Sequence, residues 1–317
     1  MTSPKDQRPV LSDEQISQIL KTMANGFRDQ FRSPLMSSPA DQGLAFEDVT
    51  FPSEDGVPLE GWFIPRAGSD KLIIANHPRW FNRTGLPAHL EPWKSLGGAT
   101  GNDFEVSFLP DYKILHDAGY NVLTYDLRNH GHSGAGNGNL ITSGRYESRD
   151  VIGSLTYART RPDLSGMTVG LFSRCLGCNS TLFAMSRAPD AFKDVRCLVG
   201  VQPLSVRAIM ARNLERLGIP AERIDELDQN LRLVTSFRLD ELSPLEAAKA
   251  VRIPSYIYQV RDDLMTYPAD VQAIFDNIPA AQKELDWIEG TTRRWDGYTH
   301  FARHPEKVLA WFEAHMA

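Results

Sequence analysis

The stretch Val169-Gly170-Leu171-Phe172-Ser173-Arg174-Cys175-Leu176-Gly177-Cys178 decides the fold of this chain. Its first residues are apolar and predict a buried strand, and the small residues that follow predict a tight turn into a helix. Ser173 and Gly177 bracket Cys175 in the pattern of the strand–turn–helix motif G-x-S-x-G, with cysteine in place of the central serine. Small flanking residues suit a strained turn in which backbones approach closely.

Two interpretations of Cys175 are open at this point. Such a turn exposes a nucleophile at the end of a strand, and a thiolate attacks more readily than a neutral hydroxyl. The same pattern also fits an ordinary strand-to-helix connection with a buried thiol, because free cysteine is often a core residue. The rest of the chain has to discriminate between the two.

Composition restricts the class of protein. The chain has 317 residues, 42% of them hydrophobic, which suits one large α/β domain or one domain with an inserted cap. The net charge is −6 and no basic patch stands out, so no nucleic-acid partner is expected. No apolar run reaches the roughly 18 residues of a membrane span, and residues 1–10 lack the apolar core of a signal peptide.

The cysteines point to a reducing compartment. Three cysteines, an odd number, do not form a disulfide framework, which favours a cytoplasmic protein. The cysteines and histidines have no zinc-binding spacing, so no metal and no other cofactor is expected.

Apolar strands alternate with helices along most of the chain, which predicts an α/β fold with a mostly parallel central sheet flanked by helices. We expect strands at 46–51, 59–65, 71–75, 121–125, 167–172, 195–201, 255–260 and 284–288, and helices at 108–117, 145–159, 177–187, 269–278 and 305–315.

Two additions interrupt this pattern. Residues 205–247 are helical without a strand, and we interpret them as a cap over the carboxyl ends of the strands, where such sheets place their sites. Residues 1–44 form an N-terminal extension with an amphipathic helix within 13–30, which docks either on its own domain or on the partner in a homodimer. The predicted core is therefore 45–204 and 248–317, with a Gly/Pro-rich irregular insertion at 82–104.

A nucleophile needs a base, and the base needs an orienting acid. The strand at 255–260 ends in Arg261-Asp262-Asp263, and His300 follows the last predicted strand. Because the carboxyl ends of parallel strands share one edge of a sheet, the order Cys175, Asp263, His300 predicts a triad. Asp262 is the alternative acid and His304 the alternative base, although an aspartate there also fits a turn cap and His304 the start of the last helix.

Taken together, these segments resemble the α/β-hydrolase superfamily over roughly residues 45–316. The loop Asp126-Leu127-Arg128-Asn129-His130-Gly131-His132-Ser133 is typical of that superfamily, which implies that His130 and His132 are structural. The elbow Cys175-Leu176-Gly177 is similar to that of dienelactone hydrolases, whose nucleophile is also cysteine. The greater length, the cap and the insertion depart from those enzymes.

The resemblance also implies an oxyanion hole and a pocket. One donor is the N–H of Leu176, and the other is the N–H of Arg79, because Pro78 has none. Arg174 either favours the thiolate, binds an anionic substrate or is a solvated or paired surface arginine. Cys178 is either a resolving thiol or a small buried residue. The candidate pocket residues are His77, Trp80, Arg174 and Tyr298, although His77 also fits a loop-shaping role.

The sequence thus predicts a hydrolase that acts on an ester, lactone or thioester of a small molecule through a thioacyl-enzyme. An acyltransferase or cyclase with the same nucleophile is the first alternative. A non-catalytic ligand-binding protein on the same fold is the second, because a fold does not fix a function.

Overall fold

The computed structural model describes residues 11–317. Within them, eight strands form one sheet in the order β1-β2-β6-β3-β7-β8-β9-β10. β2 is antiparallel to both of its neighbours and every other pair is parallel, which confirms the mostly parallel sheet. The strands are β1 (Glu47–Pro52), β2 (Pro58–Ile64), β3 (Lys71–Asn76), β6 (Asn121–Tyr125), β7 (Thr168–Arg174), β8 (Val195–Val201), β9 (Ser255–Val260) and β10 (Lys283–Ile288).

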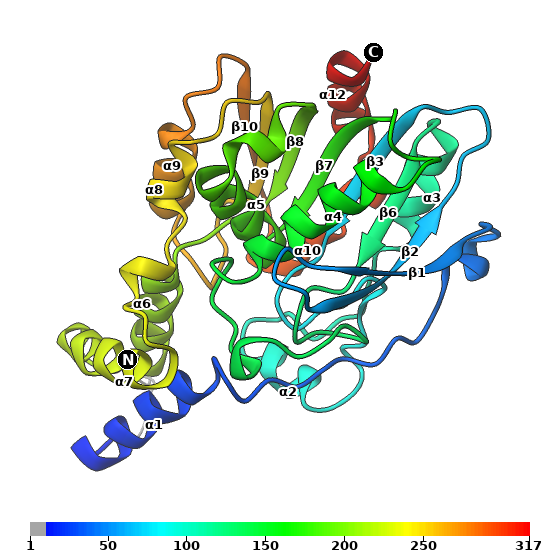
Figure 1. Ribbon diagram of the computed structural model, residues 1–317. Coiled ribbons are helices and arrows are strands. Elements are labelled where there is room, and N and C mark those ends of the chain that lie inside the picture. The colour runs from blue at the N-terminus through cyan, green and yellow to red at the C-terminus, as the bar shows by residue number, and fades with distance from the viewer. Residues whose placement is uncertain (1–10) are drawn as a thin grey trace.

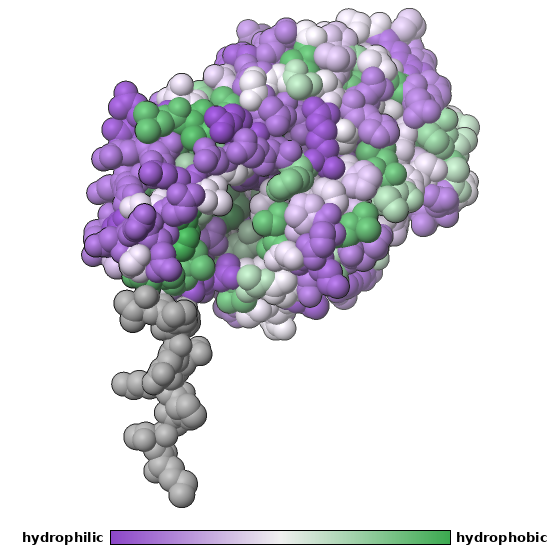
Figure 2. Space-filling view, turned by 90° about the horizontal axis from the view of Figure 1, so that it is seen from below, coloured by the Kyte–Doolittle hydropathy of each residue, from purple (hydrophilic) through white to green (hydrophobic). Residues whose placement is uncertain are grey.

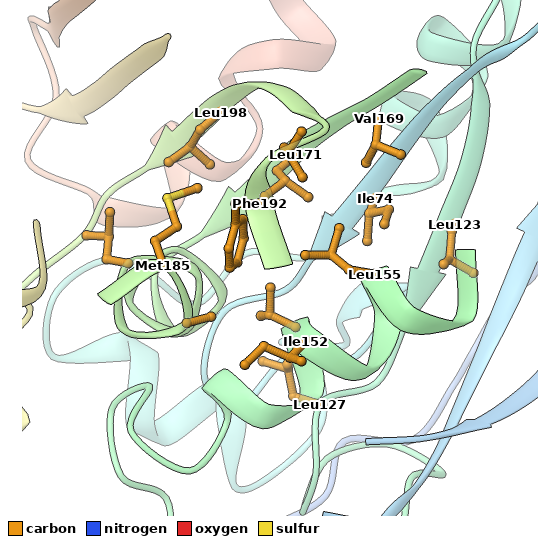
Figure 3. Packing of buried hydrophobic residues seen from close by; sticks show 14 of the residues in the cluster. Ile74, Leu123, Leu127, Ile152, Leu155, Val169, Leu171, Met185, Phe192 and Leu198 are labelled. Atoms are coloured by element: carbon orange, nitrogen blue, oxygen red, sulfur yellow. The ribbon is translucent and has the colours of Figure 1, made fainter. Parts of the chain in front are cut away.

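Side chains of the central strands alternate between two hydrophobic clusters, one on each face of the sheet. Leu72 and Ile74 of β3 belong to the first cluster, and Ile73 belongs to the second. The first cluster, shown in Figure 3, packs under α4 (Ser148–Thr160), α5 (Leu176–Arg187), α8 (Leu245–Ala248) and α9 (Pro268–Asn277). The second packs under α3 (Leu109–Asp117) and α12 (Glu306–Met316). No helix within 11–317 is long and apolar enough to cross a membrane.

The N-terminal helix packs on the cap helices of the same chain. α1 (Asp13–Asn25), α6 (Val206–Leu217) and α7 (Ile224–Thr235) share a separate hydrophobic cluster and lie together beside the core (Figure 1). We call these three helices the cap unit. α1 ends at Asn25, earlier than the predicted 30, and residues 1–10 of the extension lie outside the described residues.

Two segments are more regular than the sequence predicted. The insertion at 82–104 contains α2 (Trp93–Gly98) and β4 (Gly85–Leu86), which pairs with β5 (Val106–Ser107). The loop predicted after β10 contains α10 (Arg294–Tyr298) and α11 (His300–Arg303). These elements are too short for a periodic pattern, and α2 and α10 carry glycine, which weakens helix propensity.

The contact between α5 and β3 requires a glycine at position 177. The Gly177 N–H donates to the His77 carbonyl at 3.1 Å, and a Cβ on Gly177 would lie 2.6–2.8 Å from Asn76. This close approach places the end of β3 against the start of α5, so the loop after β3 lies beside Cys175.

Gly177→Ala should therefore destabilise the protein by about 1–3 kcal/mol, because the added methyl group meets backbone that cannot move freely. Thermal and urea denaturation measure this loss. Gly166→Ala is the matched control, since a Cβ there meets nothing within 4 Å. Equal stability of the two variants would contradict this account of the elbow.

Candidate active site

Cys175 occupies the turn between β7 and α5 in a strained conformation. Its φ is +47° and its ψ −106°, a combination that residues with a side chain rarely adopt. Hydrogen bonds on both sides hold it: the Cys175 N–H donates to the Val201 carbonyl at 2.7 Å, and the Cys175 carbonyl accepts from the Asn179 N–H at 2.8 Å. The structure thus places Cys175 at the tip of the predicted elbow.

The partly buried Cys175 side chain opens into a narrow cavity of about 80 Å³, room for several water molecules. Core and cap unit both contribute walls, which are mostly apolar, as in small-molecule sites. Figure 2 shows a hollow with a hydrophobic floor in the view from below. The apolar lining residues are Phe27, Trp80, Phe81, Ile141, Leu176, Leu204, Val206, Ile209, Met210, Met265, Trp295 and Tyr298, and the polar ones besides Cys175 are Arg79, Ser143, Asn179 and Arg294.

A buried arginine connects the cysteine side of the cavity to the predicted acid. The Arg294 guanidinium donates to the Asp263 carboxylate at 2.6 Å and, through Nε, to the Tyr298 hydroxyl at 2.9 Å. Tyr298 and Cys175 line the same cavity, and Cys175 is one of the groups that raise the pKa of the Tyr298 hydroxyl. Arg294 therefore occupies the place between acid and nucleophile that the sequence analysis assigned to a histidine.

The charges of these groups depend on one another. Burial opposes the charge of Arg294, yet Tyr298, Asp263 and Cys175 together raise the pKa of this guanidinium well above its ordinary value. Burial, with Cys175 as a second cause, raises the pKa of Tyr298 well above its ordinary range. At neutral pH the site therefore combines a fixed cation with a protonated phenol.

A second arginine approaches Cys175 from the loop after β3. Burial lowers the pKa of Arg79 to about 10, while Cys175 and Glu147 act in the opposite direction. Its guanidinium donates to the Gly26 carbonyl at 2.6 Å, and its carbon lies 4.8 Å from the centre of the Phe27 ring. Arg79 thus links the cavity to the segment that follows α1.

Two side chains far apart in sequence hold α10 in place. Asn102, from the insertion at 82–104, accepts the Trp295 N–H at 2.9 Å. Gln202 donates to the Arg294 carbonyl at 2.5 Å and accepts from the Arg294 side chain through its own carbonyl. These contacts fix the rotation of α10 about its axis and aim Arg294 and Tyr298 at Cys175.

His300 does not reach Cys175 in this structure, which departs from the predicted triad. Arg294 and Tyr298 are four residues apart and share one face of α10, whereas His300, two residues further, points away from that face. His300 lines a surface groove with Asp262, Asp296 and His304 instead, and its ring lies 5.5 Å from that of Tyr258. All eight histidines of the chain lie in the described part, and none lines the Cys175 cavity.

Two predicted pocket residues also lie elsewhere. Arg174 is fully buried outside the cavity, where it pairs with Asp111 at 2.6 Å and contacts the Phe172 ring. His77 is buried as well: its Nδ1 donates to the Pro78 carbonyl at 2.7 Å, and its Nε2 accepts the Leu127 N–H at 2.9 Å. Burial lowers the pKa of His77 to about 4, so it is a neutral residue that shapes its loop.

The other predicted residues gather at the cavity. Asp263 is buried and bonded to Arg294, whereas Asp262 is exposed, so the structure brings Asp263 to the site. Arg79, Trp80, Leu176 and Tyr298 line the cavity. Among hydrogen bonds within 11–317, none takes up the backbone N–H of Leu176 or of Arg79.

Sequence reasoning missed Arg294 and Gln202. Arg294 and Tyr298, at a spacing of four directly after the last strand, were the available signal for a helix with a shared polar face. The motif around His300 outweighed that signal. Nothing in the sequence marked Gln202, whose φ of +53° at the end of β8 turns the chain toward α10.

Comparisons with known proteins place the fold. No protein-family model matches the chain. Two Escherichia coli sequences, each described as an uncharacterized 31.7 kDa protein in the traX-finO intergenic region, are 23% and 22% identical to it over 241 and 239 residues. Each match covers 63% of this chain and 82% of the relative.

Several solved structures share the architecture. The Pyrococcus furiosus esterase Pf2001 superposes with a TM-score of 0.65 at 21% identity, covering 90% of this chain and 99% of the esterase. The α/β hydrolase GrgF from Penicillium gives 0.59 at 17% identity, covering 86% and 99%. The Pyrococcus horikoshii acylaminoacyl peptidase gives 0.57 at 13% identity, covering 86% and 42%. The chain therefore has the α/β-hydrolase fold, as its sequence predicted.

The rate at which iodoacetamide alkylates Cys175 shows whether Arg294 or His300 acts on this thiol. Arg294→Met should slow alkylation roughly tenfold, because the variant removes the buried cation that lines the same cavity as the thiol. His300→Asn should leave the rate unchanged, since His300 lies outside the cavity. The rate is measured by peptide mass spectrometry, with circular dichroism as the check on folding.

The opposite result, a slow His300→Asn variant beside an unaffected Arg294→Met variant, would mean that α10 and α11 rotate in solution to bring the histidine to Cys175.

Proposed function

We propose that this protein is a cysteine-dependent acyl hydrolase acting on an ester, thioester or lactone of a small, largely apolar molecule. One observation carries the proposal: Cys175 sits at a strained elbow on the cavity that Tyr298 and the buried Arg294 also line. The α/β-hydrolase fold supports it, because this fold exposes its nucleophile at such a turn.

Acylation in this scheme needs no separate base. Arg294 and the N-terminus of α5 favour the Cys175 thiolate, which attacks the substrate carbonyl carbon. The free N–H groups of Leu176 and Arg79 donate to the oxyanion. As the tetrahedral intermediate of an ester collapses, the leaving alkoxide takes the Tyr298 proton and a thioacyl-enzyme remains.

Deacylation returns that proton. The tyrosinate left at Tyr298 is stabilised by Arg294 and accepts a proton from water as the water attacks the thioester. The second tetrahedral intermediate expels the Cys175 thiolate and releases the acid. Tyr298 thus takes the acid–base role predicted for His300, Arg294 stabilises the tyrosinate, and Asp263 positions Arg294.

Transfer of the acyl group to an alcohol, amine or thiol, or cyclisation, is the alternative that the cavity favours most. A narrow, mostly apolar space excludes bulk water and leaves room for an acceptor. Product analysis with competing acceptors separates transfer from hydrolysis. A ligand-binding protein without catalysis predicts binding with no covalent adduct.

The variant Tyr298→Phe tests whether Tyr298 protonates the leaving group, because it removes the proposed acid and keeps the nucleophile. The variant should lose about a hundredfold or more in kcat/KM with ethyl esters, the usual range for general acid catalysis. It should lose far less with p-nitrophenyl esters, whose leaving group needs no proton. Parallel losses on both substrates would show that Tyr298 has only a packing role.

Intact-protein mass spectrometry after mixing with p-nitrophenyl acetate should show a transient acyl adduct on the wild type, mapped to Cys175. Cys175→Ala should show neither adduct nor turnover above the uncatalysed rate. Cys197→Ala is the matched control, since this buried thiol lies outside the cavity. Turnover without any adduct at Cys175 would exclude the thioacyl route.

A further inference from the structure

The spacing Cys175-Leu176-Gly177-Cys178 places two thiols on the first turn of α5, and acyl transfer uses only one of them. We propose that the pair is a redox modification site: a small hydroperoxide oxidises Cys175, and Cys178 then closes a reversible disulfide with it. The disulfide withdraws the nucleophile and stops acyl transfer. That last consequence rests on the proposed function, whereas formation of the disulfide does not.

Both cysteines lie at the end of β8. The Cys175 N–H donates to the Val201 oxygen at 2.7 Å, and the Cys178 sulfur lies against Gly200. The bond from Asn179 N–H to the Cys175 carbonyl closes a helical turn, which sets α-carbons three residues apart at about 5 Å. Disulfides span α-carbon separations of roughly 4.4–6.8 Å, a range that includes the spacing across one helical turn.

The two thiols differ in their exposure, so that one can meet an oxidant first and the other can react with it afterwards. Cys175 is partly exposed to the cavity and faces Arg294, whereas Cys178 is fully buried against Gly200. A Cβ on Gly200 would lie 2.9 Å from the Cys178 sulfur, so the glycine makes room for this thiol. An oxidant that enters the cavity therefore meets Cys175 first, and the narrow space admits a molecule the size of hydrogen peroxide.

The charge on Cys175 is a secondary influence on the pKa of Cys178. Burial raises the pKa of Cys178, and the negative charge of Cys175 adds to that rise. Once Cys175 has become a neutral sulfenic acid, the second cause is gone. Cys178 thus gives up its proton more readily at the stage when its sulfur has to attack.

The chemistry balances with the peroxide as the sole oxidant. The Cys175 thiolate attacks one peroxide oxygen, the O–O bond breaks, and the hydroxide released takes a proton from solvent to form water. The Cys178 sulfur then attacks the sulfenic sulfur, an S–S bond replaces the S–O bond, and hydroxide leaves with the Cys178 proton as a second water. Two electrons pass from the thiols to the peroxide, and an external thiol restores both by exchange.

Peptide mass spectrometry tests this on the full-length protein. The protein is treated with stoichiometric hydrogen peroxide, denatured, alkylated with N-ethylmaleimide and digested with trypsin. Cleavage after Arg174 and Arg187 yields the peptide 175–187 with both cysteines, and Cys197 falls in 197–207. We expect 175–187 to lose two hydrogens and escape alkylation, 197–207 to be alkylated, and dithiothreitol to reverse the change.

The variants Cys178→Ala and Cys178→Ser test whether Cys178 is the thiol that forms the disulfide with oxidised Cys175. In either variant Cys175 should gain oxygen atoms instead and progress to a sulfinic acid that dithiothreitol does not reduce. The proposal is overturned if wild-type Cys175 gains oxygen while Cys178 is still alkylated, or if 175–187 is fully alkylated after peroxide. Because the readout is a mass, it stays informative even if no ester proves to be a substrate.

Discussion

The ion pair between Arg294 and Asp263 is the interaction on which the arrangement of the site depends. Both side chains are almost fully buried, and the guanidinium also bonds to Tyr298 and to the Gln202 carbonyl. Removing one partner of such a pair leaves an uncompensated buried charge, which typically costs about 3–5 kcal/mol. The pair therefore joins the end of β9, the end of β8 and α10 into one rigid unit behind the nucleophile.

That unit changes the chemistry expected of the fold. In a triad built on histidine, the base titrates near neutral pH and shuttles the proton. Here a permanent cation and a phenol face the cysteine, so the nucleophile is favoured by charge, and the proton has to travel through Tyr298. The choice of cysteine fits this setting, since a thiolate needs only a cation to persist, whereas a serine hydroxyl needs a base at the moment of attack.

The sequence predicted the architecture and the elbow well, and it predicted the geometry of the last loop poorly. Strand periodicity and the pattern around Cys175 are local signals, and both survive in the fold because apolar side chains alternate across β3 and β7. The direction of His300 is not a local property. It depends on whether residues 294–298 form a helix, and that helix is held by Asn102 and Gln202 from distant segments.

The cap unit shows the same division between local and distant causes. The helical pattern of 205–247 and that of the N-terminal helix could each be predicted. Their packing against one another could not, because an amphipathic face does not show which surface covers it. In the structure, the segment just after α1 contributes Phe27 to the cavity, and Arg79 bonds the neighbouring Gly26 carbonyl. The segment just after α1 and the loop after β3 therefore meet at the wall of the Cys175 cavity, through a contact between residues 53 positions apart that neither segment predicts by itself.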